Sequence, residues 1–331
     1  MVAALSPLQF RSNQTADVER VNDALHRAAR AGDEFLTEIA THLIPARGKR
    51  LRPSFVIASA LTGHSDPLDT AAVTDDMVWA GASVELVHLG SLYHDDVMDD
   101  ADIRHGVESV NHRWGNLKAI LAGDFLLARA SEIASSLGTE IAGLLAATIA
   151  RLCEGQVAEL QRIYDRGRTE EAYLEAIGGK TAALYSTSCR IGALVADLPR
   201  DDVERLTEFG HLYGMAYQIV DDVLDVVATE EQLGKPSGND MREGVYTLPV
   251  IRMLRDEPDG DLADLLGDLL DDDQRERARR MVHEGGHIAG SIDTALGYTD
   301  AAVARLEPMN GSPAVEGLRT AAKNLMATLP D

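Results

Sequence analysis

Two stretches of the sequence carry the same spacing of aspartates, D-D-x-x-D. The six residues are Asp95, Asp96, Asp99, Asp221, Asp222 and Asp225. On a helix, residues three or four apart share a face, so the three carboxylates of each cluster should converge. Their mutual repulsion, and the loss of hydration among the apolar residues around the second cluster, both cost free energy. A hard divalent cation would offset these costs, and Mg²⁺ is usually held by one or two carboxylates together with phosphate oxygens of a substrate.

The alternative for either cluster alone is a solvated acidic face, which is common in so acidic a chain. Two matched copies, with core-type residues around the second, favour a metal site instead. We therefore expect both clusters to face one cavity and to hold magnesium ions against a phosphorylated substrate.

Basic residues are concentrated at four places that could complete such a site. The run RGKRLRP at 47–53 stands at a predicted helix start, where free backbone N–H groups also favour phosphate. Arg104 follows the first cluster in a predicted loop, Lys180 follows a pair of glycines, and Lys235 lies in a Gly/Pro/Ser loop after the second cluster. Each alone is explained as well by an ordinary surface residue. Together, in a chain this acidic, they predict two separate anion sites.

The composition limits the class of protein. The chain has 54 acidic and 31 basic residues among 331, a net charge of −23, which argues against a nucleic-acid partner. The two cysteines, Cys153 and Cys189, lie in apolar helical patterns and suit free thiols in a reducing compartment. No signal peptide is evident at the N-terminus, and no apolar stretch reads as long enough to span a bilayer. We expect a cytoplasmic protein without stable membrane insertion.

Apolar residues recur at helical spacing along almost the whole chain, while strand-like alternation is scarce. Length alone allows two domains, but no low-complexity linker divides the sequence. We therefore predict a flexible tail at residues 1–15 and a single all-α domain at 16–331. The predicted helices span 16–43, 51–62, 69–98, 116–136, 139–165, 170–196, 201–229, 245–256, 274–285, 288–309 and 313–328.

Seven motifs occur in an order that resembles the trans-prenyl diphosphate synthases, the polyprenyl synthetase family, over residues 40–255. They are G-K-R-L-R-P (48–53), E-L-x-H (85–88), D-D-x-x-D-x-x-D-x-R (95–104), G-D-x-L (123–126), G-K-T (179–181), Q-x-x-D-D-x-x-D (218–225) and G-x-D-x-x-E-G-x-x-T-L-P (238–249). The resemblance implies a multi-helix bundle of the isoprenoid synthase type around a central cavity, usually a homodimer. It also implies head-to-tail condensation of isopentenyl diphosphate with an allylic diphosphate.

The resemblance also assigns roles to residues. The six aspartates would hold magnesium, three ions per active site, on the allylic diphosphate. Arg104, Lys180 and Lys235 would complete the shell of that diphosphate, with Gln218 and Thr181 beside the nascent carbocation. Isopentenyl diphosphate would be bound by Lys49, Arg52, His88 and His105. At His105 and Val245 many relatives have arginine and lysine, and Val107-Glu108 also departs from the family pattern.

Product length in the family depends on side chains below the first cluster. Gly90 and Ser91, five and four positions before Asp95, are small, and Val87 lies one turn lower. This favours a long-chain, all-trans polyprenyl product. The alternatives are a geranylgeranyl or farnesyl diphosphate synthase of the same family or, less favoured because both clusters are intact, a non-catalytic subunit of a heteromeric synthase.

Overall fold

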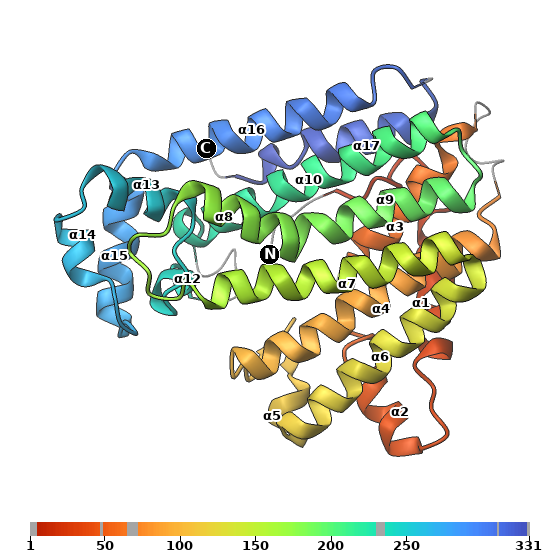
Figure 1. Cartoon of the computed structure of the whole chain (residues 1–331), viewed down its shortest axis with the longest axis horizontal. Helices are drawn as coiled ribbons and strands as arrows, with labels where there is room; N and C mark the ends of the chain where they lie inside the picture. The colour runs from red at the N-terminus through yellow and green to blue at the C-terminus, as the bar shows by residue number, and fades with distance from the viewer. Residues whose placement is uncertain (1–4, 47–48, 65–71, 230–235, 310, 330–331) are drawn as a thin grey trace.

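The protein consists of long helices packed side by side (Figure 1). The structure, a computed structural model, describes residues 5–46, 49–64, 72–229, 236–309 and 311–329. The longest helices are α4 (Asp75–Met98), α6 (Asn116–Leu137), α7 (Thr139–Leu160), α10 (Arg200–Val227) and α16 (His287–Arg305). The others are α1 (Gln14–Ala28), α2 (Glu34–Thr41), α3 (Leu51–Ala60), α5 (Val110–Trp114), α8 (Glu170–Ile177), α9 (Ala183–Val195), α12 (Asn239–Arg242), α13 (Leu248–Asp256), α14 (Asp261–Leu265), α15 (Asp272–Glu284) and α17 (Pro313–Lys323), with short turns at Leu61–Gly63, Gly178–Ala182 and Met326–Thr328. The predicted all-α fold is confirmed.

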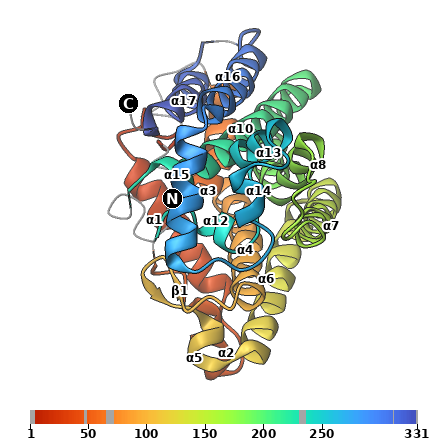
Figure 2. The same cartoon turned by 90° about the vertical axis from the view of Figure 1, so that its left-hand side faces the viewer.

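Helix α4 runs through the interior and carries the first aspartate cluster at its C-terminal end (Figure 2). Helix α6 packs along one side of it, and α3, α9 and α1 also contact it. A Cβ atom at Gly90 would lie 3.1 Å from the carbonyl oxygen of Gly123, and one at Gly123 would overlap the ring of His94. Glycine at both positions therefore lets α4 and α6 approach closely.

Helix α10 carries the second cluster and packs against α9 on one side and α16 on the other (Figure 1). Phe209 and Tyr213 of α10 are fully buried. The Tyr213 ring centre lies 4.5 Å from that of Phe55 in α3 and 5.1 Å from that of Tyr185 in α9. This aromatic cluster fixes α10 about two turns before Asp221.

Several element boundaries differ from the prediction. The single helix expected at 16–43 is two helices, because Asp33 starts α2 by accepting a hydrogen bond from the Leu36 N–H at 2.7 Å. The helix expected at 170–196 contains a π-helical turn at Gly178–Ala182. Arg104 lies in a strand rather than a loop: β1 (Ile103–Arg104) pairs antiparallel with β2 (Val107–Glu108). His105 and Gly106 close this hairpin with φ of 51° and 81°, as a two-residue turn requires.

Two further regions bear on the sequence-based expectations. In the described part of the segment predicted as a tail, Leu8 is fully buried and Arg11 pairs with Asp17 at 2.9 Å. Helix α7 is long and apolar enough to cross a membrane by length and composition, so the expectation that no stretch meets that test is wrong. One such helix is weak evidence for a membrane span, and α7 also contacts α6, α8 and α9.

Candidate active site

The two aspartate clusters meet at a cavity of about 180 Å³ between the ends of α4 and α10. Asp99 of the first cluster lines it, opposite Asp221, Asp222 and Asp225 of the second. Lys180 and Gln218 also contribute to its wall, together with Glu159, Arg168, Tyr173, Ile177, Asp240, Glu243, Val245 and Thr247. We call this the acidic cavity. Of the first cluster Asp99 alone lines this cavity, so the structure brings the two clusters together there but does not direct all six carboxylates into the same space.

Asp222 is held by a chain of hydrogen bonds from three elements. The Tyr173 hydroxyl donates to Oδ2 at 2.5 Å, and Gln218 Nε2 donates to Oδ1 at 2.7 Å. Thr181 Oγ1 in turn donates to Gln218 Oε1 at 2.7 Å, which fixes the orientation of the amide. Burial raises the pKa of Asp222 to about 7. The carboxylate is therefore oriented but not neutralised by the protein.

The first cluster contains the most deeply buried carboxylate of the site. Asp96 is fully buried, and Arg104 approaches its Oδ1 with Nε at 2.6 Å and Nη2 at 2.5 Å. Its Oδ2 has no hydrogen-bond partner among the described residues. Burial raises the pKa of Asp96 and Asp99, and that of Asp95 to about 6. One oxygen of this buried carboxylate is thus left without a hydrogen-bond partner among the described residues.

These residues fit a divalent metal ion that a substrate helps to hold. Within the described ranges, no three Asp, Glu, His or Cys side chains are close enough to bind a metal by themselves. The donors that face the acidic cavity are carboxylate oxygens, which hard cations such as Mg²⁺ prefer. The raised pKa values of Asp95 and Asp222 indicate that the surrounding protein does not fully offset the negative charge of these two carboxylates. Phosphate oxygens and water would complete such a metal shell.

Lys180 stands between the acidic cavity and an apolar one. It lines both cavities and forms an ion pair with Glu159. Burial alone would lower the pKa of Lys180, but the Glu159 carboxylate keeps it above its usual value. The side chain thus stays charged beside both clusters.

A basic cavity of about 280 Å³ adjoins the acidic one, since Gln218 and Asp221 line both. The predicted residues Lys49, Arg52, His88, Arg104, His105 and Thr181 are brought together in its wall. Burial and the Arg52 charge lower the pKa of His88 well below its usual value, and burial also lowers that of Lys49. Several cations in one cavity of an acidic protein suit an anionic group such as a diphosphate.

The apolar cavity, also about 280 Å³, lies between α4, α6 and α7. Val87 and Ser91 line it, as predicted for residues that face the growing product, and Asp95 stands at the same wall. The other lining residues are His94, Met98, Leu127, Ile149, Leu152, Cys153, Gln156, Val157, Leu160 and Lys180. Gly90 does not line it: it packs against Gly123 and Leu127 of α6.

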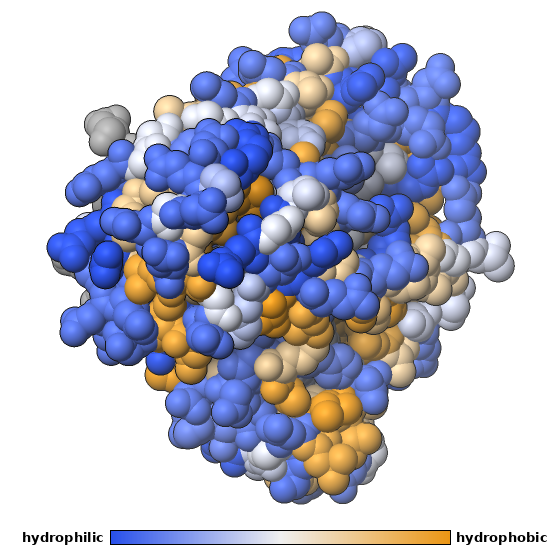
Figure 3. Space-filling model, turned by 60° about the vertical axis from the view of Figure 1, so that its left-hand side comes forward, coloured by the Kyte–Doolittle hydropathy of each residue, from blue (hydrophilic) through white to orange (hydrophobic). Residues whose placement is uncertain are grey.

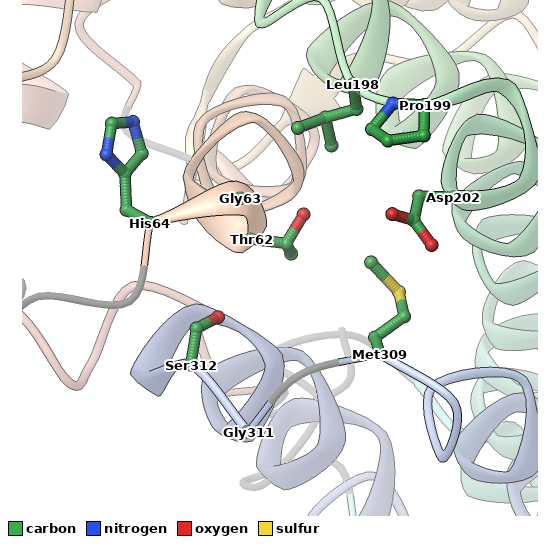
Figure 4. Close-up of a pocket in the computed structure, with 9 residues that line it drawn as sticks. All are labelled: Thr62, Gly63, His64, Leu198, Pro199, Asp202, Met309, Gly311 and Ser312. Atoms are coloured by element: carbon green, nitrogen blue, oxygen red, sulfur yellow. The ribbon is translucent and has the colours of Figure 1, made fainter.

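A fourth cavity of about 380 Å³ lies where the turn after α3 meets the start of α10 and of α17 (Figure 4). Thr62, Leu198, Asp202 and Met309 surround the hollow, whereas the His64 side chain points away from it. None of the sequence-predicted site residues contributes to its wall.

The predicted residues and the residues of the site do not match completely. Two residues considered from the sequence, Lys235 and Arg47, lie outside the described residues. Tyr173, Glu159 and Arg168 belong to the acidic cavity but were not predicted. Tyr173 precedes Lys180 by seven residues, two helical turns, and this spacing is the signal that could have placed it on the same side.

The comparisons with known proteins agree with this geometry. The sequence model of the family described as polyprenyl synthetase matches residues 33–284. The chain belongs to the polyprenyl synthetase family. A nonaprenyl diphosphate synthase of Mycobacterium tuberculosis is 40% identical over 90% of this chain and 88% of its own length. A heptaprenyl diphosphate synthase component 2 of Geobacillus stearothermophilus is 42% identical over 73% of each chain.

Solved structures of polyprenyl synthetase family members share the fold. A polyprenyl synthase of Caulobacter crescentus, complexed with calcium and isoprenyl diphosphate, superposes with a TM-score of 0.87 at 31% identity. The match covers 95% of this chain and 95% of that one. The bundle is therefore that of the family along almost its whole length.

Proposed function

We propose that this protein is a prenyltransferase that condenses isopentenyl diphosphate with an allylic prenyl diphosphate, head to tail, and releases pyrophosphate. The observation that carries the proposal is the junction of three cavities of different chemistry. An acidic cavity, a basic cavity and an apolar cavity share walls through Lys180, Gln218 and Asp221. They suit, respectively, a metal-bound diphosphate, a second diphosphate and a hydrocarbon chain.

The residues divide the reaction between them. The six aspartates would hold Mg²⁺, three ions per site, and the metal would neutralise the departing pyrophosphate. Lys180 would donate to the allylic diphosphate in the acidic cavity, and Arg104, which bonds Asp96 from the basic cavity, would act between the two diphosphates. Isopentenyl diphosphate would be held by Lys49, Arg52, His88 and His105. The allylic C–O bond breaks with its electron pair left on oxygen, the double bond of the second substrate then forms the new C–C bond, and one proton leaves.

The carbocation must be protected while it exists. Thr181 and Gln218 lie where the basic and acidic cavities meet, and the Thr181 hydroxyl is engaged with the Gln218 amide. Their neutral dipoles can face developing positive charge without a nucleophile that would capture it. The apolar side chains of α4 and α7 that line the third cavity offer no nucleophile on the hydrocarbon side, and a partner over the exposed Val157 and Leu160 would help to exclude water there.

The wall of the apolar cavity supports a long-chain product. Its described lining contains no Phe, Tyr or Trp, and beyond His94 the α4 residues that line it before Asp95 are Ser91 and Val87. Because serine and valine have small side chains, they would not block a hydrocarbon chain that extends along α4 away from Asp95. We therefore propose a long-chain, all-trans polyprenyl diphosphate as the product, with geranylgeranyl or farnesyl diphosphate as the shorter alternative.

A homodimer is the assembly that the surface favours. Leu117, Ile120 and Leu121 of α6 and Val157 and Leu160 of α7 are exposed apolar residues. Figure 3 shows apolar areas within the hydrophilic surface, including one at the lower end where Figure 1 places α2, α5 and α6. Only 22% of the most apolar stretch of α7 is buried within the chain, so a second copy could cover this face. We propose this dimer in the cytoplasm.

Incubation with labelled isopentenyl diphosphate and allylic starters of several lengths, followed by chromatography of the products, tests the proposal. A ladder that ends well beyond geranylgeranyl diphosphate is expected. A ladder that ends at geranylgeranyl or farnesyl diphosphate would replace the long-chain assignment. Activity that appears only when another subunit is added would indicate a component of a heteromeric synthase.

A further inference from the structure

Arg168 is a buried cation in the wall of the acidic cavity, in the loop between α7 and α8. Its relative exposure is 5%. Nη1 donates to the backbone carbonyl of Tyr246 at 3.1 Å, and the guanidinium carbon lies 5.5 Å from the centre of the Tyr173 ring. Nε and Nη2 have no hydrogen-bond partner among the described residues, and no ion pair of Arg168 occurs there.

A guanidinium in this position is costly for the metal-free, substrate-free protein. Burial of a cation with no carboxylate in hydrogen-bond contact loses hydration, and the charges of Glu159 and Asp222 offset that loss only in part. Burial accordingly lowers the pKa of Arg168. The other basic residue that lines the described acidic cavity, Lys180, is already paired with Glu159. An anion in this cavity could therefore accept hydrogen bonds from Nε and Nη2 of Arg168, which have no partner among the described residues.

The geometry of the guanidinium indicates which anion. Nε–H and Nη2–H lie on the same edge of the planar group and point in parallel, an arrangement that matches two oxygens of a phosphate or carboxylate. On the other side of the group Nη1 donates to the Tyr246 carbonyl, and the Tyr173 ring packs against the guanidinium face; together these contacts fix the orientation of the Nε/Nη2 edge.

We propose that Arg168 is a further diphosphate-binding residue, which donates from its Nε/Nη2 edge to the pyrophosphate moiety in the acidic cavity. This inference rests on the proposed prenyl transfer. When the allylic C–O bond breaks, its electron pair stays with the diphosphate, whose negative charge grows by one. Arg168 remains protonated and takes no part in proton transfer. It stabilises that added charge, so its contribution is larger for released pyrophosphate than for the bound substrate.

Calorimetric titration of inorganic pyrophosphate in the presence of Mg²⁺ tests the proposal on the full-length protein. Arg168→Gln should weaken binding about tenfold or more, because hydrogen bonds to a charged group are lost. Arg166→Gln is the matched control: Arg166 lies in the same loop and donates to a backbone carbonyl, that of Ala263 at 2.7 Å, but does not line the cavity. Its pyrophosphate affinity should stay within about twofold of wild type.

A second substitution separates lost charge from lost packing. Val245 lines the same cavity, so Val245→Lys in the Arg168→Gln background should restore part of the affinity. The Michaelis constant for isopentenyl diphosphate should change little in Arg168→Gln, because Arg168 is absent from the wall of the basic cavity. Wild-type pyrophosphate affinity in folded Arg168→Gln would overturn the proposal, as would failure of Val245→Lys to restore any affinity.

Should Arg168→Gln fail to fold, Arg168→Lys serves instead. A lysine cannot bond the Tyr246 carbonyl and present a two-donor edge together, so about threefold to tenfold weaker pyrophosphate binding is expected. Unchanged binding would overturn the proposal. If the wild-type protein forms prenyl product while these variants bind pyrophosphate normally, only the role of Arg168 fails. If the wild-type protein forms no product, the proposed function fails.

Discussion

Asp222→Asn should stabilise the metal-free protein at pH 8 while it removes activity. Burial raises the pKa of Asp222 from 3.8 to about 7. Below about pH 4 the carboxyl is protonated in both the folded and the unfolded chain, so it contributes no difference. Between pH 4 and 7 the unfolded chain releases the proton while the folded chain keeps it, so the free energy of unfolding falls as pH rises. Above pH 7 the loss is complete and stays constant.

The magnitude follows from the separation of the two pKa values. Each pH unit between them is worth about 1.4 kcal/mol, so the ionised Asp222 destabilises the metal-free fold by about 4 kcal/mol at pH 8. Asparagine removes the charge and keeps the shape: its oxygen can accept from Gln218, and its amide can donate to the Tyr173 oxygen. We expect a gain of up to about 4 kcal/mol at pH 8 and little difference at pH 4.

Urea unfolding of both proteins in excess chelator, from pH 4 to 8, measures this difference. Asp201→Asn is the control, since Asp201 is exposed in the first turn of the same helix and should change stability by only a few tenths of a kcal/mol. Prenyl transfer by Asp222→Asn should fall by orders of magnitude. A variant no more stable than wild type at pH 8 would refute the claim that the negative charge of Asp222 is uncompensated in the metal-free protein.

Three further predictions, the first with a control substitution, test other parts of the site. Ser91→Phe should shorten the product toward geranylgeranyl or farnesyl diphosphate, with the first condensations little changed. An unaltered product distribution would show that the growing chain does not pass Ser91. Gly90→Ala is the control: its methyl group would crowd α6, so it should lower stability instead. Tyr173→Phe should raise the magnesium concentration needed for half-maximal activity about tenfold, because Asp222 loses an orienting donor; an unchanged requirement would contradict this. His105→Arg should lower the Michaelis constant for isopentenyl diphosphate and abolish its rise with pH, because arginine keeps the positive charge that histidine loses. Desolvation and Arg104 lower the pKa of His105, although its side chain remains exposed. An unchanged pH profile would place His105 outside the binding site.

The parts of the site that are local in sequence were predictable. The D-D-x-x-D spacing places three carboxylates on one face of a helix whatever surrounds it. The run at 47–53 and the G-K-T segment are likewise short motifs, and most of their described residues line the basic or the acidic cavity: Lys49, Arg50, Leu51, Arg52, Lys180 and Thr181. Pairing across the fold was not predictable in this way. Tyr173 and Asp222 are 49 residues apart, and neither segment contains a pattern that predicts their hydrogen bond.

Gly90 shows where counting along a helix stops being informative. A helix turns about 100° per residue, so Gly90 and Ser91 cannot face the same neighbour. Spacing alone places both near Asp95, but only the packing of α4 against α6 decides that Ser91 faces the cavity and Gly90 faces Gly123. The break between α1 and α2 is similar, because a glycine and a capping aspartate interrupt a pattern that otherwise reads as one helix.

The most direct test of the joint action of the three cavities is the ratio of pyrophosphate released to isopentenyl units incorporated, measured in one reaction. Prenyl transfer at this site predicts one pyrophosphate per isopentenyl unit throughout chain growth, with both signals abolished by excess chelator and restored by Mg²⁺. Pyrophosphate release without incorporation, or incorporation that continues in excess chelator, would contradict it.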